Sequence, residues 1–202
     1  MLSDLLYSLR DTEFLFNLFG YISFRSGLSL ITSFLLVLIL MPYWIKLQQI
    51  NFPSGQPIRN DGPDTHFLKK GTPTLGGVLI LCSIILSSIL WTSNFSSFNY
   101  ILILTLILFG LIGFVDDLQK VKLGKGISSK TKFLYQLLAT IIIFFTIKYN
   151  GFDLNNFSIP FLKNVSIEIG YFYFVLILLI VIGSTNATNL TDGLDGLVSM
   201  PL

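Results

Sequence analysis

The sequence predicts an all-α membrane protein that crosses the bilayer several times. Of its 202 residues, 52% are hydrophobic and only 12% are charged, and the mean hydropathy is +0.75. Soluble domains carry about 25% charged residues, so this composition excludes that class. Five apolar runs approach the roughly 20 residues that a transmembrane helix needs, and Arg25, at one end of the first run, is their only charged residue.

Polar segments separate the five predicted spans, and one membrane domain over residues 1–202 is the simplest organisation. No repeat and no low-complexity linker divides the sequence. The first span is expected to direct its own insertion, because charged residues interrupt the segment before it and no cleavage site follows an apolar core. The spans are predicted at 24–45, 74–91, 99–115, 133–147 and 170–185.

The segment between the fourth and fifth spans, residues 150–168, has a pattern of its own. Apolar residues alternate with others around Lys163 and Asn164, which is typical of a short β-hairpin. An irregular loop is an equally good interpretation. The alternating residues are Phe157, Ile159, Phe161, Val165, Ile167 and Ile169.

Lysine and arginine are distributed unevenly, and this distribution predicts the orientation of the chain. Nine of the thirteen lie in two loops, which the positive-inside rule assigns to the cytoplasm. With five spans, the segment after Thr185 lies on that same side and the N terminus lies outside. The nine are Lys46, Arg59, Lys69, Lys70, Lys120, Lys122, Lys125, Lys130 and Lys132; the remaining four are Arg10, Arg25, Lys148 and Lys163.

An adjacent carboxylate pair, Asp116 and Asp117, follows the third predicted span. If the helix continues past Val115, Asp116 and Lys120 meet on one face, while Asp117 points about 100° away. The two acids could then take different roles, one toward a metal or proton and one toward a second partner. Solvated charges at a helix end are the alternative. Acids at a helix C-terminus oppose the macrodipole, however, and a charge near the bilayer is costly, which favours a function.

The other two inner segments are also rich in polar residues. Residues 60–77 carry Gly and Pro together with Lys69 and Lys70, and such a loop either presents amides and charge to an anion or is only a connector. In the last segment, polar residues recur every third position. They form a stripe on a helix that could bind hydroxyls, a base edge or a hydrated cation, or they simply end the fifth span. The stripe consists of Asn186, Asn189, Asp192 and Asp195.

All three polar segments fall on the side that the charge distribution assigns to the cytoplasm. Adjacent acids and several lysines at a membrane surface suit phosphoryl transfer with a divalent cation, because its transition state requires positioning and charge neutralisation. Mg²⁺ prefers carboxylate oxygens and bridges substrate phosphates. This placement predicts one lipid phosphate substrate and one soluble cytoplasmic substrate.

Each inner segment contains a longer motif. The motifs are Asp61-Gly62-Pro63 with His66, Lys69 and Gly71-Thr72-Pro73-Thr74-Leu75-Gly76-Gly77; Gly113-Phe114-Val115-Asp116-Asp117 with Lys120; and Asn186 with Asn189-Leu190-Thr191-Asp192-Gly193-Leu194-Asp195-Gly196-Leu197. In this order they resemble the phospho-N-acetylmuramoyl-pentapeptide transferase family, within the polyprenyl-phosphate N-acetylhexosamine-1-phosphate transferase superfamily. The resemblance covers the whole chain, and the first motif is the most specific to the muramoyl-pentapeptide branch.

The resemblance implies an Mg²⁺-dependent enzyme in the bacterial plasma membrane with its active-site loops in the cytoplasm. In the implied reaction, undecaprenyl phosphate attacks the sugar-proximal phosphate of UDP-N-acetylmuramoyl-pentapeptide, which releases UMP and forms the first lipid-linked peptidoglycan precursor. The implied process is cell wall biogenesis, and with it cell shape and cell division. The expected partners are the two substrates and the bilayer, with a homodimer left open and no nucleic acid.

The resemblance also implies roles for individual residues. By position, Asp116 matches the acid proposed to deprotonate or orient the lipid phosphate, and Asp117 matches its partner near the metal and the phosphates. Either acid could ligate Mg²⁺, and the principal ligand is expected beyond Leu202. The residues that match the nucleotide and diphosphate pocket are Lys69, Thr74, Lys120, Lys132, Asn186, Asn189, Asp192 and Asp195.

The family is longer than this sequence, with about ten spans, a further metal-binding Asp in a later loop and a His-rich loop after it. The chain is therefore expected to be the N-terminal part of such an enzyme and to be inactive alone. Three alternatives stay open: a transferase of N-acetylglucosamine-1-phosphate, a decayed copy that folds without acting, and a non-enzymatic scaffold or transporter. A transport site favours charged residues at mid-span, and the predicted spans carry none there.

Overall fold

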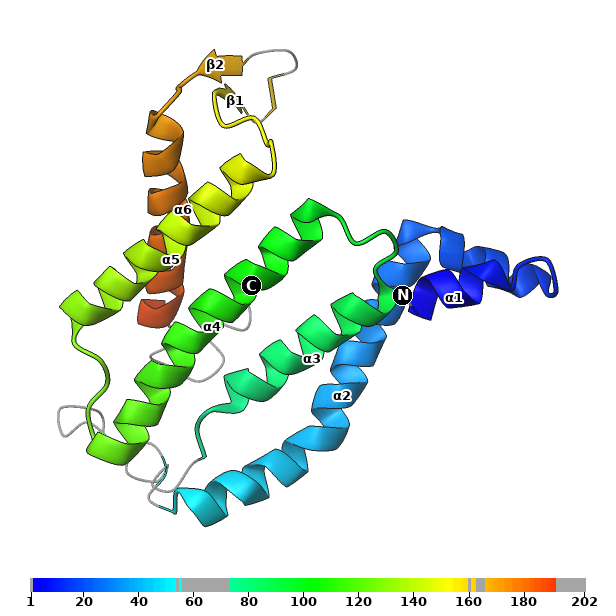
Figure 1. Ribbon diagram of the computed structural model, residues 1–202. Helices are drawn as coiled ribbons and strands as arrows, with labels where there is room; N and C mark the ends of the chain where they lie inside the picture. The colour runs from blue at the N-terminus through cyan, green and yellow to red at the C-terminus, as the bar shows by residue number, and fades with distance from the viewer. Residues whose placement is uncertain (1, 54, 56–72, 160, 163–165, 192–202) are drawn as a thin grey trace. The chain divides into compact units, whose positions relative to one another are not determined.

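Helices form at all five predicted spans. The computed structural model describes residues 2–53, 55, 73–159, 161–162 and 166–191. Four helices are long and apolar enough to cross a membrane, and the fifth, α3, is apolar but has only 16 residues. This confirms the predicted all-α polytopic fold class. The five helices are α2 (Ile22–Asn51), α3 (Gly76–Trp91), α4 (Ser97–Leu123), α5 (Ser129–Tyr149) and α6 (Phe172–Thr191), shown in Figure 1.

Helix α2 is longer than its predicted span and is not straight. It continues past Ile45 to Asn51, because Lys46, Leu47 and two glutamines form helix readily, although the lysine and the glutamines are too polar for a span. Pro42 lies inside it, where the missing N–H and the ring clash with the preceding turn disturb the helical bonds. Figure 1 shows the ribbon of α2 changing direction in its second half.

Two compact units make up the chain, and Met1–Ser128 is the first of them. In it α2 packs against α3, and α3 packs against α4. The contact between α2 and α3 is polar at two places: Ser29 lies 3.3 Å from Ser87 between their hydroxyl oxygens, and Trp91 Nε1–H donates to Thr32 Oγ1 at 2.9 Å. Small hydroxyl residues let apolar helices approach closely and bond across the interface.

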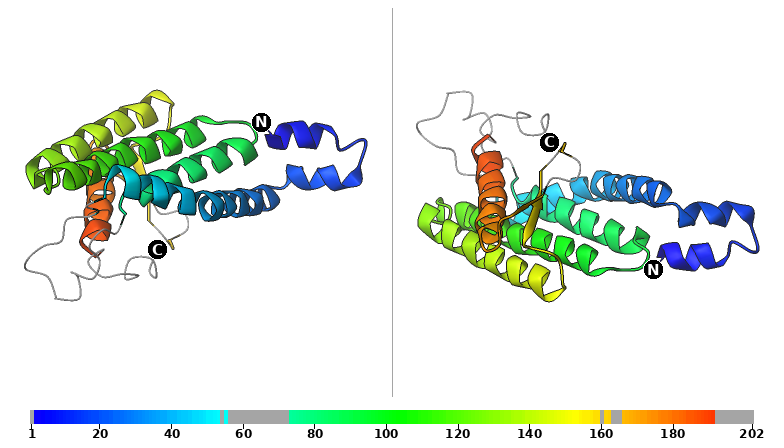
Figure 2. Two further views of the ribbon diagram at one scale, coloured as in Figure 1. Left: turned by 90° about the horizontal axis from the view of Figure 1, so that it is seen from below. Right: turned by 90° about the horizontal axis from the view of Figure 1, so that it is seen from above.

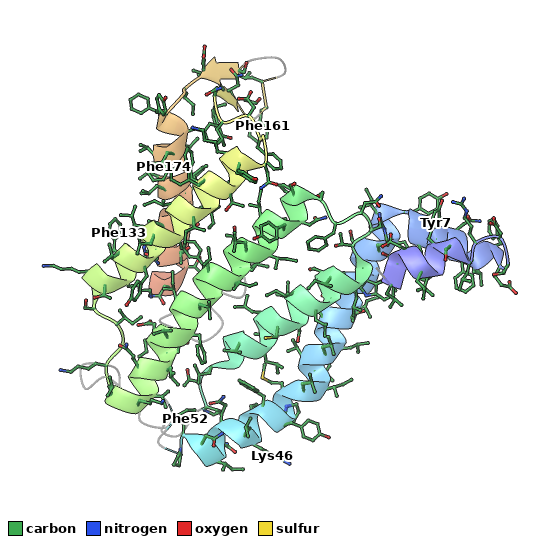
Figure 3. The ribbon with its side chains drawn as sticks, viewed as in Figure 1. Tyr7, Lys46, Phe52, Phe133, Phe161 and Phe174 are labelled. Atoms are coloured by element: carbon green, nitrogen blue, oxygen red, sulfur yellow. The ribbon has the colours of Figure 1, made fainter. Side chains whose placement is uncertain are left out.

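Before α2 the chain forms a helical hairpin, which the sequence pattern did not predict. It consists of α1 (Leu2–Ser8) and the 3₁₀ helix η1 (Phe14–Gly20), and Figure 2 shows it extending beyond the start of α2. The Arg10 guanidinium carbon lies 4.6 Å from the centre of the Tyr7 ring, which Figure 3 labels. A Cβ on Gly20 would lie 2.8 Å from that ring, so any other residue at this position would require the ring to shift.

The second unit, Ser129–Leu202, contains α5, α6 and a two-stranded sheet. Strands β1 (Asn156–Ser158) and β2 (Ser166–Glu168) pair antiparallel, with Phe157 opposite Ile167. The predicted β-hairpin is confirmed. The chain turns into β1 at Asp153, whose pKa is held below its ordinary value by bonds from the Asn155 backbone N–H and the Asn156 side chain. Edge-to-face contact between the Phe144 and Phe174 rings joins the helices.

Unlike a soluble protein, the described part of the chain exposes many large apolar side chains and buries several polar ones. The four largest side chains with less than 2% exposure are all polar, whereas apolar side chains along α2, such as Phe34 at 61%, are exposed. Such a surface is stable where the solvent is lipid, because lipid tails are as apolar as the side chains. The four are Gln136, Thr140, Ser3 and Ser87.

Candidate functional site

Helix α4 continues through the acid pair and for six residues beyond it. It ends at Leu123, where Gly124 takes a left-handed φ of +71° and donates its N–H to Lys120 O at 2.9 Å. The acids therefore lie within the helix, and not at its C-terminus as the predicted end at Val115 implied. Lys120 and Lys122 occupy the last turn, where cations are favoured by the macrodipole.

Lys120 joins the two acids into one cluster. Its Nζ lies 2.9 Å from Asp116 Oδ2 and 2.8 Å from Asp117 Oδ1. The predicted contact at i and i+4 between Asp116 and Lys120 is confirmed. Asp117 was expected to point away from Lys120 toward a separate partner, and this expectation is wrong for one of its oxygens. The long side chain of Lys120 reaches Asp117, three residues earlier, as well as Asp116.

The loop after α4 returns to the same cluster. The Ile127 N–H donates to Asp116 Oδ1 at 2.9 Å, across eleven residues of sequence. Asp116 therefore has its two oxygens on two different partners, Oδ1 on the backbone and Oδ2 on Lys120. Its side chain is only 8% exposed, whereas that of Asp117 is 39% exposed. The neighbouring acids thus have distinct environments.

The chemistry of the cluster follows from these contacts. Two carboxylates and one ammonium leave an excess negative charge, which attracts a cation. Among the described residues, every contact of Asp117 goes through Oδ1, so Oδ2 can accept a further ligand. The described residues contain no group of three or more His, Cys, Asp or Glu side chains that would enclose a metal. The pair fits Mg²⁺ as one or two carboxylates of a shell completed by water and substrate phosphates.

The second unit places Asn186 in a side-chain amide pair. Asn186 Nδ2 donates to Gln136 Oε1 at 3.0 Å, and Gln136 Nε2 donates back to Asn186 Oδ1 at 3.4 Å. Gln136 is almost completely buried on α5, where an unbonded amide would be costly. Asn189, one turn further along α6, is exposed. The two asparagines of the predicted stripe therefore differ: Asn186 bonds to Gln136 of α5, whereas the side chain of Asn189 is exposed.

The other predicted pocket residues are placed individually. Thr74 lies in the segment just before α3, and Lys132 lies in the first turn of α5. Lys69 and the acids Asp192 and Asp195 lie outside the described residues, as does His66. The structure thus brings Asp116, Asp117 and Lys120 together in the first unit.

Two contributors to these sites were missed by the sequence interpretation. The contact from Ile127 to Asp116 is made by a backbone N–H. Almost every residue has this group, so the sequence does not indicate which one contacts the acid. Gln136 was counted within an apolar span, although a lone amide among Leu and Ile residues is itself a signal, since it must find a partner when buried.

Comparison with known proteins supplies independent information on the whole chain. Three relatives described as phospho-N-acetylmuramoyl-pentapeptide-transferase match it over its full length. They come from Desulfotalea psychrophila (43% identical, 56% of that protein covered), Desulforapulum autotrophicum (42%, 56%) and Rickettsia prowazekii (40%, 57%). The chain spans about half the length of the curated relatives it matches.

The sequence model of the family described as "Glycosyl transferase family 4" matches residues 99–202. This range covers half of the chain and includes the acid pair, Lys120, the return to Ile127 and the Asn186 pair. The chain, a transferase homologue with several membrane helices, therefore belongs to glycosyl transferase family 4.

Proposed function

We propose that this chain forms part of an enzyme that transfers phospho-N-acetylmuramoyl-pentapeptide from its UDP carrier to undecaprenyl phosphate. A lipid phosphate oxygen bonds to the sugar-proximal phosphorus, the bond from that phosphorus to the UMP oxygen breaks, and UMP leaves. The observation that carries the proposal is the cluster of Asp116, Asp117 and Lys120. The names of the relatives, at 40–43% identity along the whole chain, support the same reaction.

The environments of the two acids support a division of roles. Asp116 is buried with both oxygens engaged, so it acts as a fixed charge that orients Lys120 and the lipid phosphate more than as a free base. A lipid phosphate is already largely ionised at pH 7 and does not require complete deprotonation. Asp117, with Oδ2 available, is the acid that would hold Mg²⁺.

Mg²⁺, when bound, would supply charge neutralisation on the diphosphate. Lys120 bridges the two carboxylates and would present a cation to the transferred phosphate. The remaining pocket residues would bind the nucleotide and the diphosphate, and we include in this role Lys69, Thr74, Lys132, Asn186, Asn189, Asp192 and Asp195. The cluster lies in the segment that the charge distribution assigns to the cytoplasmic side of a bacterial plasma membrane.

The 202-residue chain alone is expected to be inactive, because it covers only 56–57% of its relatives and offers two described carboxylates for the metal. The test uses this chain and a chimera in which it replaces the matching part of the Desulfotalea psychrophila protein. UMP release is measured with undecaprenyl phosphate, Mg²⁺ and either UDP-N-acetylmuramoyl-pentapeptide or UDP-N-acetylglucosamine. We expect release only from the chimera with the muramoyl substrate, and none after chelation of Mg²⁺.

Asp117→Asn in the chimera is expected to lower the rate at least about 100-fold, the scale of losing one preorganised electrostatic group. A rate near that of the unchanged chimera would remove Asp117 from the metal site. Release from UDP-N-acetylglucosamine instead would assign the chain to the related sugar-1-phosphate transferases. UMP release by the 202-residue chain would show that the described acids suffice.

A further inference from the structure

The loop that follows α4, residues 124–128, is built to contact the acid pair, and it is called the return loop below. Gly124 reverses the chain in a left-handed conformation directly after the last helical residue. The next residues run back along α4 and bring the Ile127 N–H to 2.9 Å from Asp116 Oδ1. The donor belongs to the backbone, so its direction is fixed by the fold of the loop and not by a rotatable side chain.

Gly126 makes this return possible through the absence of a side chain. A Cβ at this position would lie 2.6 Å from Asp116 Oδ1 and 3.1 Å from Lys120 Cε. The Asp116 carboxylate cannot simply rotate away, because the Ile127 N–H and the Lys120 ammonium hold its two oxygens. The φ of Gly126 lies outside the left-handed region, unlike that of Gly124, so alanine is compatible with its backbone. The requirement for glycine here comes from the close approach to the acid.

We propose that the return loop, through Gly126 and the Ile127 N–H, is a positioning element that fixes the carboxylate of Asp116. In this arrangement Asp116 Oδ1 accepts from the backbone of Ile127 and Asp116 Oδ2 contacts Lys120. Asp117 is then the acid that is open to a metal or phosphate. The catalytic meaning of this arrangement rests on the proposed function, whereas the positioning itself is a property of the chain. Phosphoryl transfer depends on geometry, and a displacement of about 1 Å can cost about 100-fold in rate.

The first experiment measures positioning without any substrate. Amide hydrogen exchange at Ile127 is followed in the 202-residue chain in detergent. Asp116→Ala removes the acceptor, and we expect exchange at Ile127 to become at least about 10-fold faster, because the opening of this bond controls it. Asp116→Asn keeps a side-chain oxygen and is expected to retain most of the protection. Asp117→Ala is the matched control and should leave Ile127 exchange unchanged.

The second experiment measures the consequence for catalysis in the chimera. Gly126→Ala is expected to lower kcat at least about 10-fold while the KM for the UDP substrate changes less than about twofold, because the displaced group acts on the reacting phosphate. Lys125→Ala is the matched control, because Lys125 lies in the same loop with an exposed side chain. It should leave kcat close to that of the unchanged chimera.

The outcomes separate the two claims. Unchanged Ile127 exchange in Asp116→Ala would overturn the positioning of the acid by the loop. A kcat for Gly126→Ala equal to that of the unchanged chimera, or equal to that of Lys125→Ala, would overturn its catalytic consequence. A chimera that is inactive on both UDP-sugars while Ile127 exchange responds as expected would contradict the proposed function and still support positioning.

Discussion

At the scale of residues, the acid pair shows how two neighbours in sequence acquire different properties. Asp116 is buried and has its oxygens divided between Lys120 and the backbone of Ile127, whereas Asp117 shares Lys120 and stays 39% exposed. A buried carboxylate is stable only with such partners, because its desolvation must be offset by charge and hydrogen bonds. Lys120 is therefore the residue on which both acids depend.

Lys120→Met is expected to destabilise the chain by about 1–3 kcal/mol, because it removes the ammonium that lies 2.9 Å from an oxygen of the buried Asp116 carboxylate. The partial exposure of Lys120 keeps the cost below that of breaking a fully buried ion pair. Lys122→Met is the matched control, since Lys122 lies in the same last turn but is exposed. Thermal unfolding in detergent measures the difference, and equal midpoints for the two variants would show that the cluster adds no stability.

At the scale of elements, contacts set by helical periodicity could be predicted from the sequence, and contacts made by loops or between helices could not. The spacing of Asp116 and Lys120 follows from 3.6 residues per turn, and this contact is confirmed. The Ile127 contact depends on the turn at Gly124, and periodicity carries no information on where a loop returns. Asn186 was selected for its place in a polar stripe, and its partner is 50 residues away on another helix.

The amide pair of α5 and α6 is expected to couple these helices energetically. In a double-mutant cycle of Gln136→Ala and Asn186→Ala, we expect a coupling free energy of about 0.5–1.7 kcal/mol, the range measured for polar contacts between membrane helices. The same cycle with Asn189→Ala is the control, because Asn189 is exposed on the next turn. Unfolding measurements that give equal coupling in both cycles would contradict a specific bond.

At the scale of the whole molecule, the fold class could be predicted from composition. One element, the hairpin of α1 and η1, could not be predicted because charged residues interrupt its apolar pattern. The five apolar runs form helices, and four of these are long and apolar enough to cross a membrane. The hairpin of α1 and η1 was not predicted, since Asp4, Arg10, Asp11 and Glu13 interrupt its apolar residues. It forms through local contacts, such as Arg10 on the Tyr7 ring, that a count of apolar residues does not detect.

The orientation of the chain across the membrane can be tested with single cysteines. The only native cysteine, Cys82, lies in apolar α3 and is replaced by serine. Phe161→Cys then reports on the hairpin, where Phe161 is fully exposed, and Ser129→Cys reports on the start of α5. Neither substitution alters the charges that set the orientation.

A membrane-impermeant maleimide is applied to spheroplasts before and after permeabilisation. We expect Phe161→Cys to react in intact spheroplasts and Ser129→Cys to react only after permeabilisation, because Lys120, Lys122, Lys125, Lys130 and Lys132 flank the latter site and retain it in the cytoplasm. The reverse pattern would place the acid pair outside, away from any soluble UDP-sugar. Reaction of both cysteines in intact spheroplasts would mean that α5, although 21 residues long, does not cross the membrane.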